Sequence, residues 1–248
     1  MALSERFIEI SARVRNWGRW GDDDELGTLN LITQDTVRTA GDCIRTGKTF
    51  PLAVPLEADG IQVGFIPGRD NPIRTMIALN DPLEPNSDPN AFHTSDDAVK
   101  MGLQAGTHWD GLGHASYGGR IYNGYPDTTV TGEAGATRCG IERIRSLCSR
   151  GVLLDVARLK GVDILDCPYA ITAGDLDEAA AMGGVEVRAG DIVLVRTGRM
   201  AIYHSEGGLA YCLGPAGDGS NAGLSMSTVE WFHKRDIAAV ANDTLAFE

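Results

Sequence analysis

The chain has 248 residues, of which 43% are hydrophobic, so it is long enough to bury a large core in one domain. Its formal net charge of −12 argues against nucleic acid as a partner, because such proteins normally carry a basic patch. The sequence has no signal-peptide pattern and no run of about 18 apolar residues, which predicts a cytoplasmic protein with no membrane partner. Five cysteines without a CxxC pair predict reduced thiols.

The first quarter of the chain predicts a loop, a helix and an edge strand. Residues 16–27 combine two tryptophans, several glycines and an acidic run, which is typical of an ordered loop. Thr33 is a good N-cap for a helix that we expect to end near Gly47. Residues 50–56 favour a strand, and its two prolines confine that strand to the edge of a sheet.

The middle of the chain is dominated by loop-forming residues. Residues 57–73 and 81–96 are rich in Gly, Pro, Asn and Asp, and they flank a short apolar segment at 75–79. Loops of this length are often functional. A strand is expected at 98–103, where it would lead into a glycine-rich segment that begins at Gly106.

The second half alternates helical and apolar segments. Helices are expected near residues 141–148, 172–182 and 227–234, and buried strands at 151–156, 192–195 and 237–240. This alternation is typical of the α/β class. We find neither an internal repeat nor a domain linker, so residues 1–248 are expected to form a single domain.

Three polar residues in the glycine-rich segment could hold a metal ion. His108, Asp110 and His114 are separated by even numbers of residues, so an extended segment would point their side chains to one side. Imidazole nitrogen and carboxylate oxygen suit Zn²⁺ or Mn²⁺, and such a centre lowers the pKa of bound water to about 7. Spacing alone leaves a metal site and a chance cluster as open alternatives.

Three tryptophans and one His/Glu pair are weaker candidates for site residues. Trp17 and Trp20 flank glycines in a loop, so they are candidate substrate-binding walls, as is Trp109 inside the glycine-rich segment. His204 and Glu206 are metal-binding residue types, but they lie in a stretch that also predicts an exposed loop.

The segment Gln104–His114 resembles the signature His-x-Gly-Thr-His-x-Asp-x-Pro-x-His of the cyclase family, which includes bacterial kynurenine formamidases and isatin hydrolases. Residues 16–30, 117–124 and 241–248 are similar to a longer-chain branch of this family. Members of that branch continue past the position of Glu248, so we expect either that this sequence is truncated at its C-terminus or that the protein lacks a terminal segment that normally covers the core.

The resemblance implies a role for each residue of the motif. His108 and Asp110 take the positions of metal ligands, and His114 takes that of the catalytic acid/base. Gln104 stands where the family has its first histidine, and Leu112 stands where it has proline. Because the amide oxygen of Gln104 is a neutral and weaker donor, we expect one Mn²⁺ or Zn²⁺ ion, with Mn²⁺ favoured over a two-zinc centre.

The resemblance also implies a fold and an activity. The fold would be a single α/β domain with a mixed sheet, similar to the swivelling β/β/α class, in a homodimer. The activity would be metal-dependent hydrolysis of a C–N bond in a small amide, formamide or cyclic amide. A metal-dependent cyclase or lactone hydrolase and a non-catalytic metal or small-molecule binding protein stay open as alternatives.

Overall fold

A three-stranded parallel sheet is the centre of the C-terminal half of the chain in the computed structural model, which describes residues 3–84, 88–245 and 247. The strand order is β5 (Gly151–Asp155), β7 (Ile192–Arg196) and β9 (Ala239–Asn242). The strands predicted at 151–156 and 192–195 are confirmed, and the third begins two residues later than predicted.

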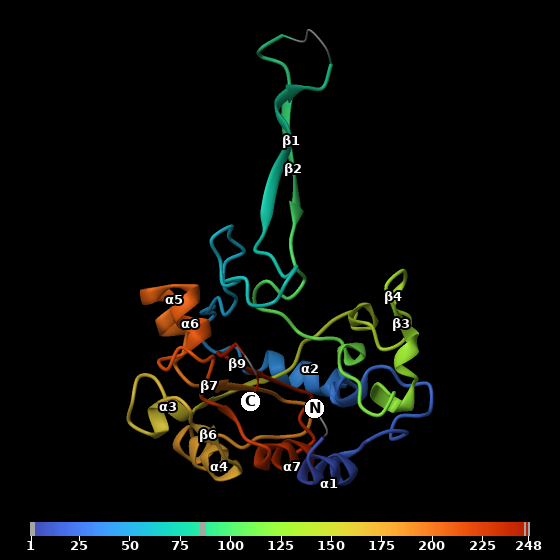
Figure 1. Cartoon of the computed structure of the whole chain (residues 1–248), viewed down its shortest axis with the longest axis vertical. Helices are drawn as coiled ribbons and strands as arrows, with labels where there is room; N and C mark the ends of the chain where they lie inside the picture. Colours follow the sequence, from blue (N-terminus) through green and yellow to red (C-terminus); the bar gives the residue numbers. More distant parts are fainter. Residues whose placement is uncertain (1–2, 85–87, 246, 248) are drawn as a thin grey trace.

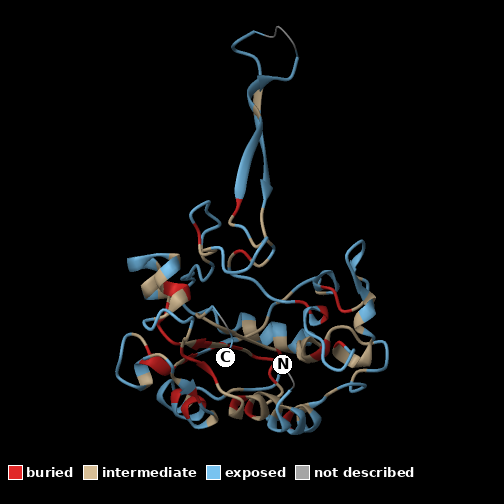
Figure 2. Cartoon of the chain, viewed as in Figure 1, coloured by how far each residue is buried: buried red, intermediate tan, exposed pale blue. Residues whose placement is uncertain are grey.

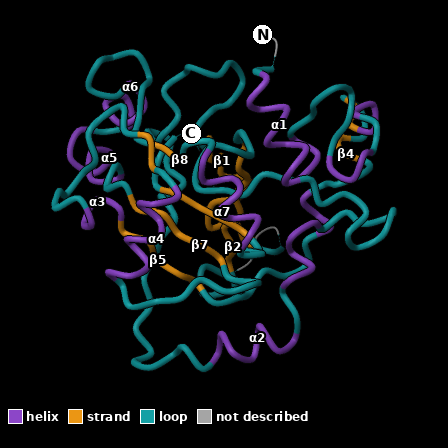
Figure 3. The backbone as a smooth tube through the Cα atoms, turned by 90° about the horizontal axis from the view of Figure 1, so that it is seen from below, coloured by secondary structure: helices purple, strands orange, loops and turns teal. Residues whose placement is uncertain are grey.

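Helices cover one face of this sheet and close the main core. They are α3 (Val156–Leu159), α4 (Ala173–Met182) and α7 (Ser227–Lys234), and α1 (Glu5–Val14) packs on α7 (Figure 3). The core side chains come from the inward positions of the strands and from these helices: Val152, Leu154, Ile171, Leu176, Val193, Val195, Leu224 and Trp231. Burial alternates along β5, so this strand, which the sequence predicts to be buried, buries only one of its faces.

The predicted helix caps form as the sequence indicates. Thr33 caps α2 (Gln34–Gly41) in a capping box with Thr36, and the helix ends six residues before the predicted Gly47. The Thr172 hydroxyl caps α4 by accepting the backbone N–H of Asp175, and the Asp175 carboxylate accepts the Thr172 N–H in return. Each cap satisfies donors that the first helical turn leaves unpaired.

The remaining elements are short. Two helices, α5 (Met200–Glu206) and α6 (Gly208–Leu213), lie side by side, and β6 (Ala170–Ile171) pairs in parallel with β8 (Gly223–Leu224). A small hairpin joins β3 (Val130–Thr131) and β4 (Gly135–Ala136). The described part of the chain also contains five 3₁₀ turns: η1 (Gly27–Leu31), η2 (Leu112–His114), η3 (Tyr122–Gly124), η4 (Asp127–Thr129) and η5 (Ile141–Arg143).

Two predicted elements are wrong. Residues 50–56 are irregular, because two prolines remove backbone donors. The Val54 N–H donates to the Thr107 hydroxyl at 3.0 Å and not to a neighbouring strand. The helix predicted at 141–148 is only the turn η5, and Ile144 is already extended (φ −85°, ψ 94°). An ion pair between Arg143 and Glu25 ties this segment to the distant N-terminal loop.

The most conspicuous feature is an antiparallel arm made of β1 (Ile73–Pro82) and β2 (His93–Lys100), which projects away from the rest of the molecule (Figure 1). Its pairing runs from Ile73 opposite Lys100 to Pro82 opposite His93, with two register shifts on the way. Almost all of its described residues are exposed (Figure 2). The sequence predicted loops over most of this region and a strand only at 98–103, because acidic and amide residues hide the strand pattern.

The predicted α/β class is confirmed, since helices occur together with parallel and antiparallel strands. In the part of the chain that the structure describes, no helix has the length and apolar character needed to cross a membrane. All five cysteines are free thiols.

Candidate metal centre

The motif residues lie at the base of the arm, after the end of β2. Residues 104–111 have no regular secondary structure, and His114 belongs to the turn η2. The prediction of one extended segment is therefore wrong for His114, because a 3₁₀ turn places residues by a period of three. The turn nevertheless brings its ring back to Asp110.

Four side chains of the motif converge on one another. The Asp110 Oδ1 atom lies 2.8 Å from His114 Nδ1 and 3.7 Å from His108 Nε2. The Gln104 side-chain nitrogen lies 3.4 Å from His114 Nδ1. The residues that the sequence singled out are thus neighbours in space, and Asp110 stands between the two imidazoles.

The ring of His108 is oriented by the backbone. Its Nδ1 lies 2.8 Å from the Gly106 carbonyl oxygen, so the N–H at this nitrogen donates and Nε2 keeps its lone pair. A bond from the second ring nitrogen to a carbonyl is the usual outer-shell arrangement of a metal-binding histidine. The free nitrogen faces Asp110, which makes the pair suitable for one cation.

Asp110 is held in its charged form. Burial by itself would raise the pKa of this carboxyl, but the hydrogen bond from His114 and the charges of the two imidazoles outweigh burial and lower the pKa below its ordinary value. A further hydrogen bond from Gln104 acts in the same direction. The carboxylate can therefore orient His114 and also bind a cation at neutral pH.

A neighbouring loop supports the start of the motif. The Gln62 side-chain amide donates to the carbonyl oxygens of Gln104 (3.2 Å) and Ala105 (3.3 Å). Gln62 is held in turn by Asn71, whose amide group bonds to both its backbone N–H and its carbonyl. The sequence does not reveal this support, because a glutamine in a loop gives no local sign of its distant partner.

The end of the motif rests on the segment 138–141. The Gly113 N–H donates to the Cys139 carbonyl at 2.9 Å. A Cβ atom at Gly111 would lie 3.0 Å from the Ile141 nitrogen and 3.3 Å from the Cys139 oxygen. Both contacts are with backbone atoms, which cannot rotate away. Glycine is therefore required here for the close approach of two chain segments.

Replacing Gly111 with alanine is expected to destabilise the protein by about 1–3 kcal/mol, the usual cost of forcing a methyl group into a packed site. The motif must shift to make room, so metal affinity should fall as well. Urea unfolding and metal titration measure the two effects. Gly132→Ala is the matched control, since no atom lies within 4 Å of its added Cβ. Equal stability of both variants would show that the motif does not depend on this contact.

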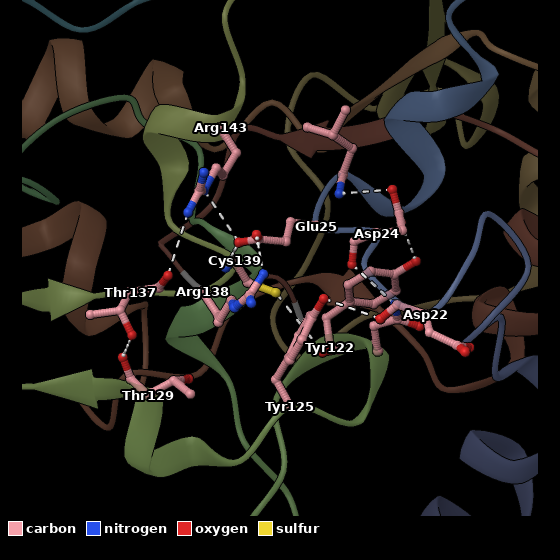
Figure 4. Close-up of polar contacts among 12 residues, drawn as sticks. Asp22, Asp24, Glu25, Tyr122, Tyr125, Thr129, Thr137, Arg138, Cys139 and Arg143 are labelled. Carbon is pink, nitrogen blue, oxygen red and sulfur yellow. Dashed lines mark hydrogen bonds and ion pairs between the residues drawn. The ribbon is translucent and has the colours of Figure 1, made fainter.

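A cluster around Glu25 holds the segment 138–141 in place (Figure 4). The Glu25 side chain is only 11% exposed, and it contacts the guanidinium groups of Arg138 (3.1 Å) and Arg143 (3.2 Å). Its second oxygen accepts the backbone N–H of Cys139 at 2.6 Å. Burial raises the pKa of the Cys139 thiol to about 11, so this cysteine is an uncharged packing residue.

Asp24 organises the adjoining loop. Its carboxylate accepts bonds from the Gly27 N–H (2.9 Å), the Asn30 amide (2.6 Å) and the Tyr122 hydroxyl (2.7 Å). Burial would raise the pKa of Asp24, but these bonds outweigh it and keep the pKa below its ordinary value. The sequence predicts only an ordered loop at the acidic run 22–25, and the clustering of acids beside glycines and tryptophans is its one local signal of this network.

The three tryptophans lie in different surroundings. Trp17 packs against Gly124, with the Arg15 guanidinium 4.6 Å from its ring. Trp20 lies beneath Arg19, which pairs with Asp236. Trp109 is exposed within the motif itself. Their role in substrate binding stays a prediction.

His204 and Glu206 are exposed, as predicted, but they lie on helix α5 and not in a loop. Helix α5 packs against α6, with the Tyr203 ring beside His204. Across residues 3–84, 88–245 and 247, no group of three or more His, Cys, Asp or Glu side chains is placed to hold a metal ion. His108 and Asp110 are thus two donors of these types, and a third donor would have to be of another type, such as the Gln104 amide.

Comparison with known proteins agrees with the motif. The Cyclase family model ("Putative cyclase") matches residues 43–248. A solved structure described as that of a novel cyclase is similar over 100% of this chain and 79% of its own, with 36% sequence identity and a TM-score of 0.83. None of the curated proteins compared with this chain matches it.

Proposed function

This chain belongs to the cyclase family, and we propose that it is a metal-dependent hydrolase that cleaves the C–N bond of a small amide, formamide or cyclic amide. The observation that supports this best is the orientation of His108, whose Nδ1 bonds to the Gly106 carbonyl while Nε2 faces the carboxylate of Asp110. That arrangement suits a cation, because the second ring nitrogen of a metal-binding histidine usually bonds to a carbonyl or a carboxylate.

The donors fit a single divalent ion. His108 and Asp110 would bind it, with the amide oxygen of Gln104 as a third ligand from the same segment. Two oxygen donors and one imidazole suit Mn²⁺ comparatively well, and Zn²⁺ would also be accepted. When bound, such an ion supplies Lewis acidity toward a carbonyl group and makes water a stronger acid.

His114 would move the proton. Its Nδ1–H donates to Asp110 at 2.8 Å, which fixes the ring and leaves the lone pair of Nε2 free. In this tautomer Nε2 can take a proton from the attacking water and return it to the nitrogen that leaves the substrate. Asp110 orients the ring for both transfers, as a carboxylate does for a catalytic histidine in other hydrolases.

Metal analysis tests the ligand assignment directly. The purified protein should retain about one divalent ion per chain after mild dialysis, and added metal should raise its Tm. His108→Ala and Asp110→Asn should each lose the ion and the thermal shift, because each removes a ligand. His233→Ala is the control, since this residue lies on α7. Unchanged metal content in both motif variants would rule out the assignment.

Gln104→His provides a second test, because it restores a histidine at the first position of the motif. Imidazole binds zinc better than a neutral amide oxygen does, so the variant should bind Zn²⁺ more tightly and prefer it over Mn²⁺. Isothermal titration with each metal measures the change. Two tightly bound zinc ions in the unaltered protein, or no change of preference in the variant, would contradict the proposed role of Gln104.

A substrate panel distinguishes the alternatives. Turnover of N-formylkynurenine or isatin with added Mn²⁺ or Zn²⁺ would support C–N hydrolysis. Turnover of simple lactones alone would favour a lactone hydrolase, and metal binding without any turnover would favour a binding protein.

A further inference from the structure

A groove beside helix α2 forms a second concave site, and no residue of the motif 104–114 lines it. Residues 26–38 form one wall and residues 143–148 form the other. Helix α2 has no buried residue and lies at the margin of the molecule, apart from the three-stranded sheet (Figure 3). The groove, which we call the α2 groove, has a volume of about 690 Å³. This volume is within the range of small-molecule sites, about 300–1,000 Å³.

Much of the lining of the α2 groove is aliphatic. Val37 on α2 is exposed, and the other aliphatic side chains of the lining are half-buried. Aliphatic surface that stays in contact with water is unfavourable, and in a concave site it favours a ligand with an apolar body. The aliphatic lining residues are Leu26, Leu29, Ile32, Val37 and Ile144.

The charge of the α2 groove is opposite to that of the whole chain. Although the chain has 34 acidic and 22 basic residues, the described residues that line the groove include three arginines and neither Asp nor Glu. Two of the arginines already have partners, since Arg38 pairs with Asp35 (3.4 Å) and Arg143 with Glu25 (3.2 Å). Within the part of the chain that the structure describes, the Arg145 guanidinium has neither an ion pair nor a hydrogen bond. The groove therefore offers one guanidinium group to an anion.

We propose that the α2 groove binds an amphipathic monocarboxylate, a small molecule with one carboxylate group and an apolar body. The guanidinium of Arg145 matches a carboxylate through two parallel hydrogen bonds, and the apolar body would cover the aliphatic lining. A bare inorganic anion would leave that lining in water, and a polyanion would find only one unpaired guanidinium. The chain's charge of −12 also repels nucleic acid and anionic membranes.

This ligand class is related to the proposed reaction. Hydrolysis of an amide by water releases a carboxylic acid and an amine, so the occupant of the α2 groove belongs to the chemical class of one product. A separate site for it would let the protein bind such a product without occupying the metal centre. This relation rests on the proposed function, whereas the binding itself does not.

Isothermal titration of the metal-loaded protein with sodium decanoate, below the concentration at which it forms micelles, tests the proposal. We expect one saturable site per chain. Arg38→Gln/Arg145→Gln should weaken binding at least about tenfold, because it removes charge-assisted hydrogen bonds. Arg158→Gln is the matched control, since this exposed arginine lies on α3, and it should bind as the unaltered protein does. Absence of saturable binding, or equal affinity of the double variant, would overturn the proposal.

Two further probes separate the parts of the ligand. Acetate lacks the apolar body and decyltrimethylammonium carries the opposite charge, so each should bind at least about tenfold more weakly than decanoate. Equal binding of either probe would refute an amphipathic carboxylate as the occupant. If decanoate does not bind and the double variant sediments with a lower mass than the unaltered protein, the groove is a contact between copies and the proposal is wrong.

A carboxylate could also bind a metal ion, so the metal centre needs its own control. His108→Ala, which should lose the metal, is expected to keep its affinity for decanoate. Loss of decanoate binding in His108→Ala, with full binding in Arg38→Gln/Arg145→Gln, would place the carboxylate at the metal centre and overturn the groove assignment. Decanoate binding does not depend on turnover. A protein that binds decanoate in the α2 groove but hydrolyses no C–N substrate would refute only the proposed function.

Discussion

His114→Ala is expected to reduce turnover by about 10²–10⁴-fold, the usual contribution of a general acid or base, while the protein keeps its metal. The reason is geometric, because His114 contacts the carboxylate of Asp110 through Nδ1 and leaves its other nitrogen for the substrate. Removing the ring should therefore remove proton transfer but leave His108 and Asp110 as ligands.

Steady-state kinetics on the best substrate of the panel, together with metal analysis of the same sample, measure both effects. His204→Ala is the control, because this histidine lies on α5 and should have no part in the reaction. Loss of the metal together with activity would place His114 among the ligands. Full activity of His114→Ala would show that another group transfers the proton.

Glu25→Ala is expected to lower the free energy of unfolding by about 2–4 kcal/mol, because it leaves the Cys139 amide and two guanidinium groups without their acceptor. The loss is smaller than for a fully buried ion pair, since both arginines reach solvent. The segment 138–141 should then loosen, and with it the backbone on which Gly111 and Gly113 rest.

Urea unfolding at one fixed protein concentration measures the stability change. Metal titration of the folded variant shows whether the site is affected. Glu142→Ala is the control, because Glu142 also contacts Arg143 but is largely exposed. If the two variants are equally stable, the Glu25 cluster is not what holds the motif's support in place.

The parts of the fold that sequence predicted correctly are those with a local signal. A short apolar run is enough to indicate β5 or β7, and a threonine before a helical pattern indicates the caps at Thr33 and Thr172. The motif from Gln104 to His114 is likewise contained in eleven consecutive residues, so the chain's membership of the cyclase family could be inferred from sequence.

The sequence by itself thus determined the α/β class, the strands and helices around the main core, and the residues of the candidate centre. Only the tertiary structure decided how these residues are arranged. The pairing of Asp110 with His114 depends on the turn η2, whose Gly113 N–H donates to the Cys139 carbonyl. The Cys139 N–H donates in turn to Glu25, which is 114 residues away in the chain. The arm is a similar case, because neither β1 nor β2 has a clear strand pattern and each becomes a strand only by hydrogen bonding to the other. Interactions between distant segments leave no local periodicity, so they become visible only when the chain is folded.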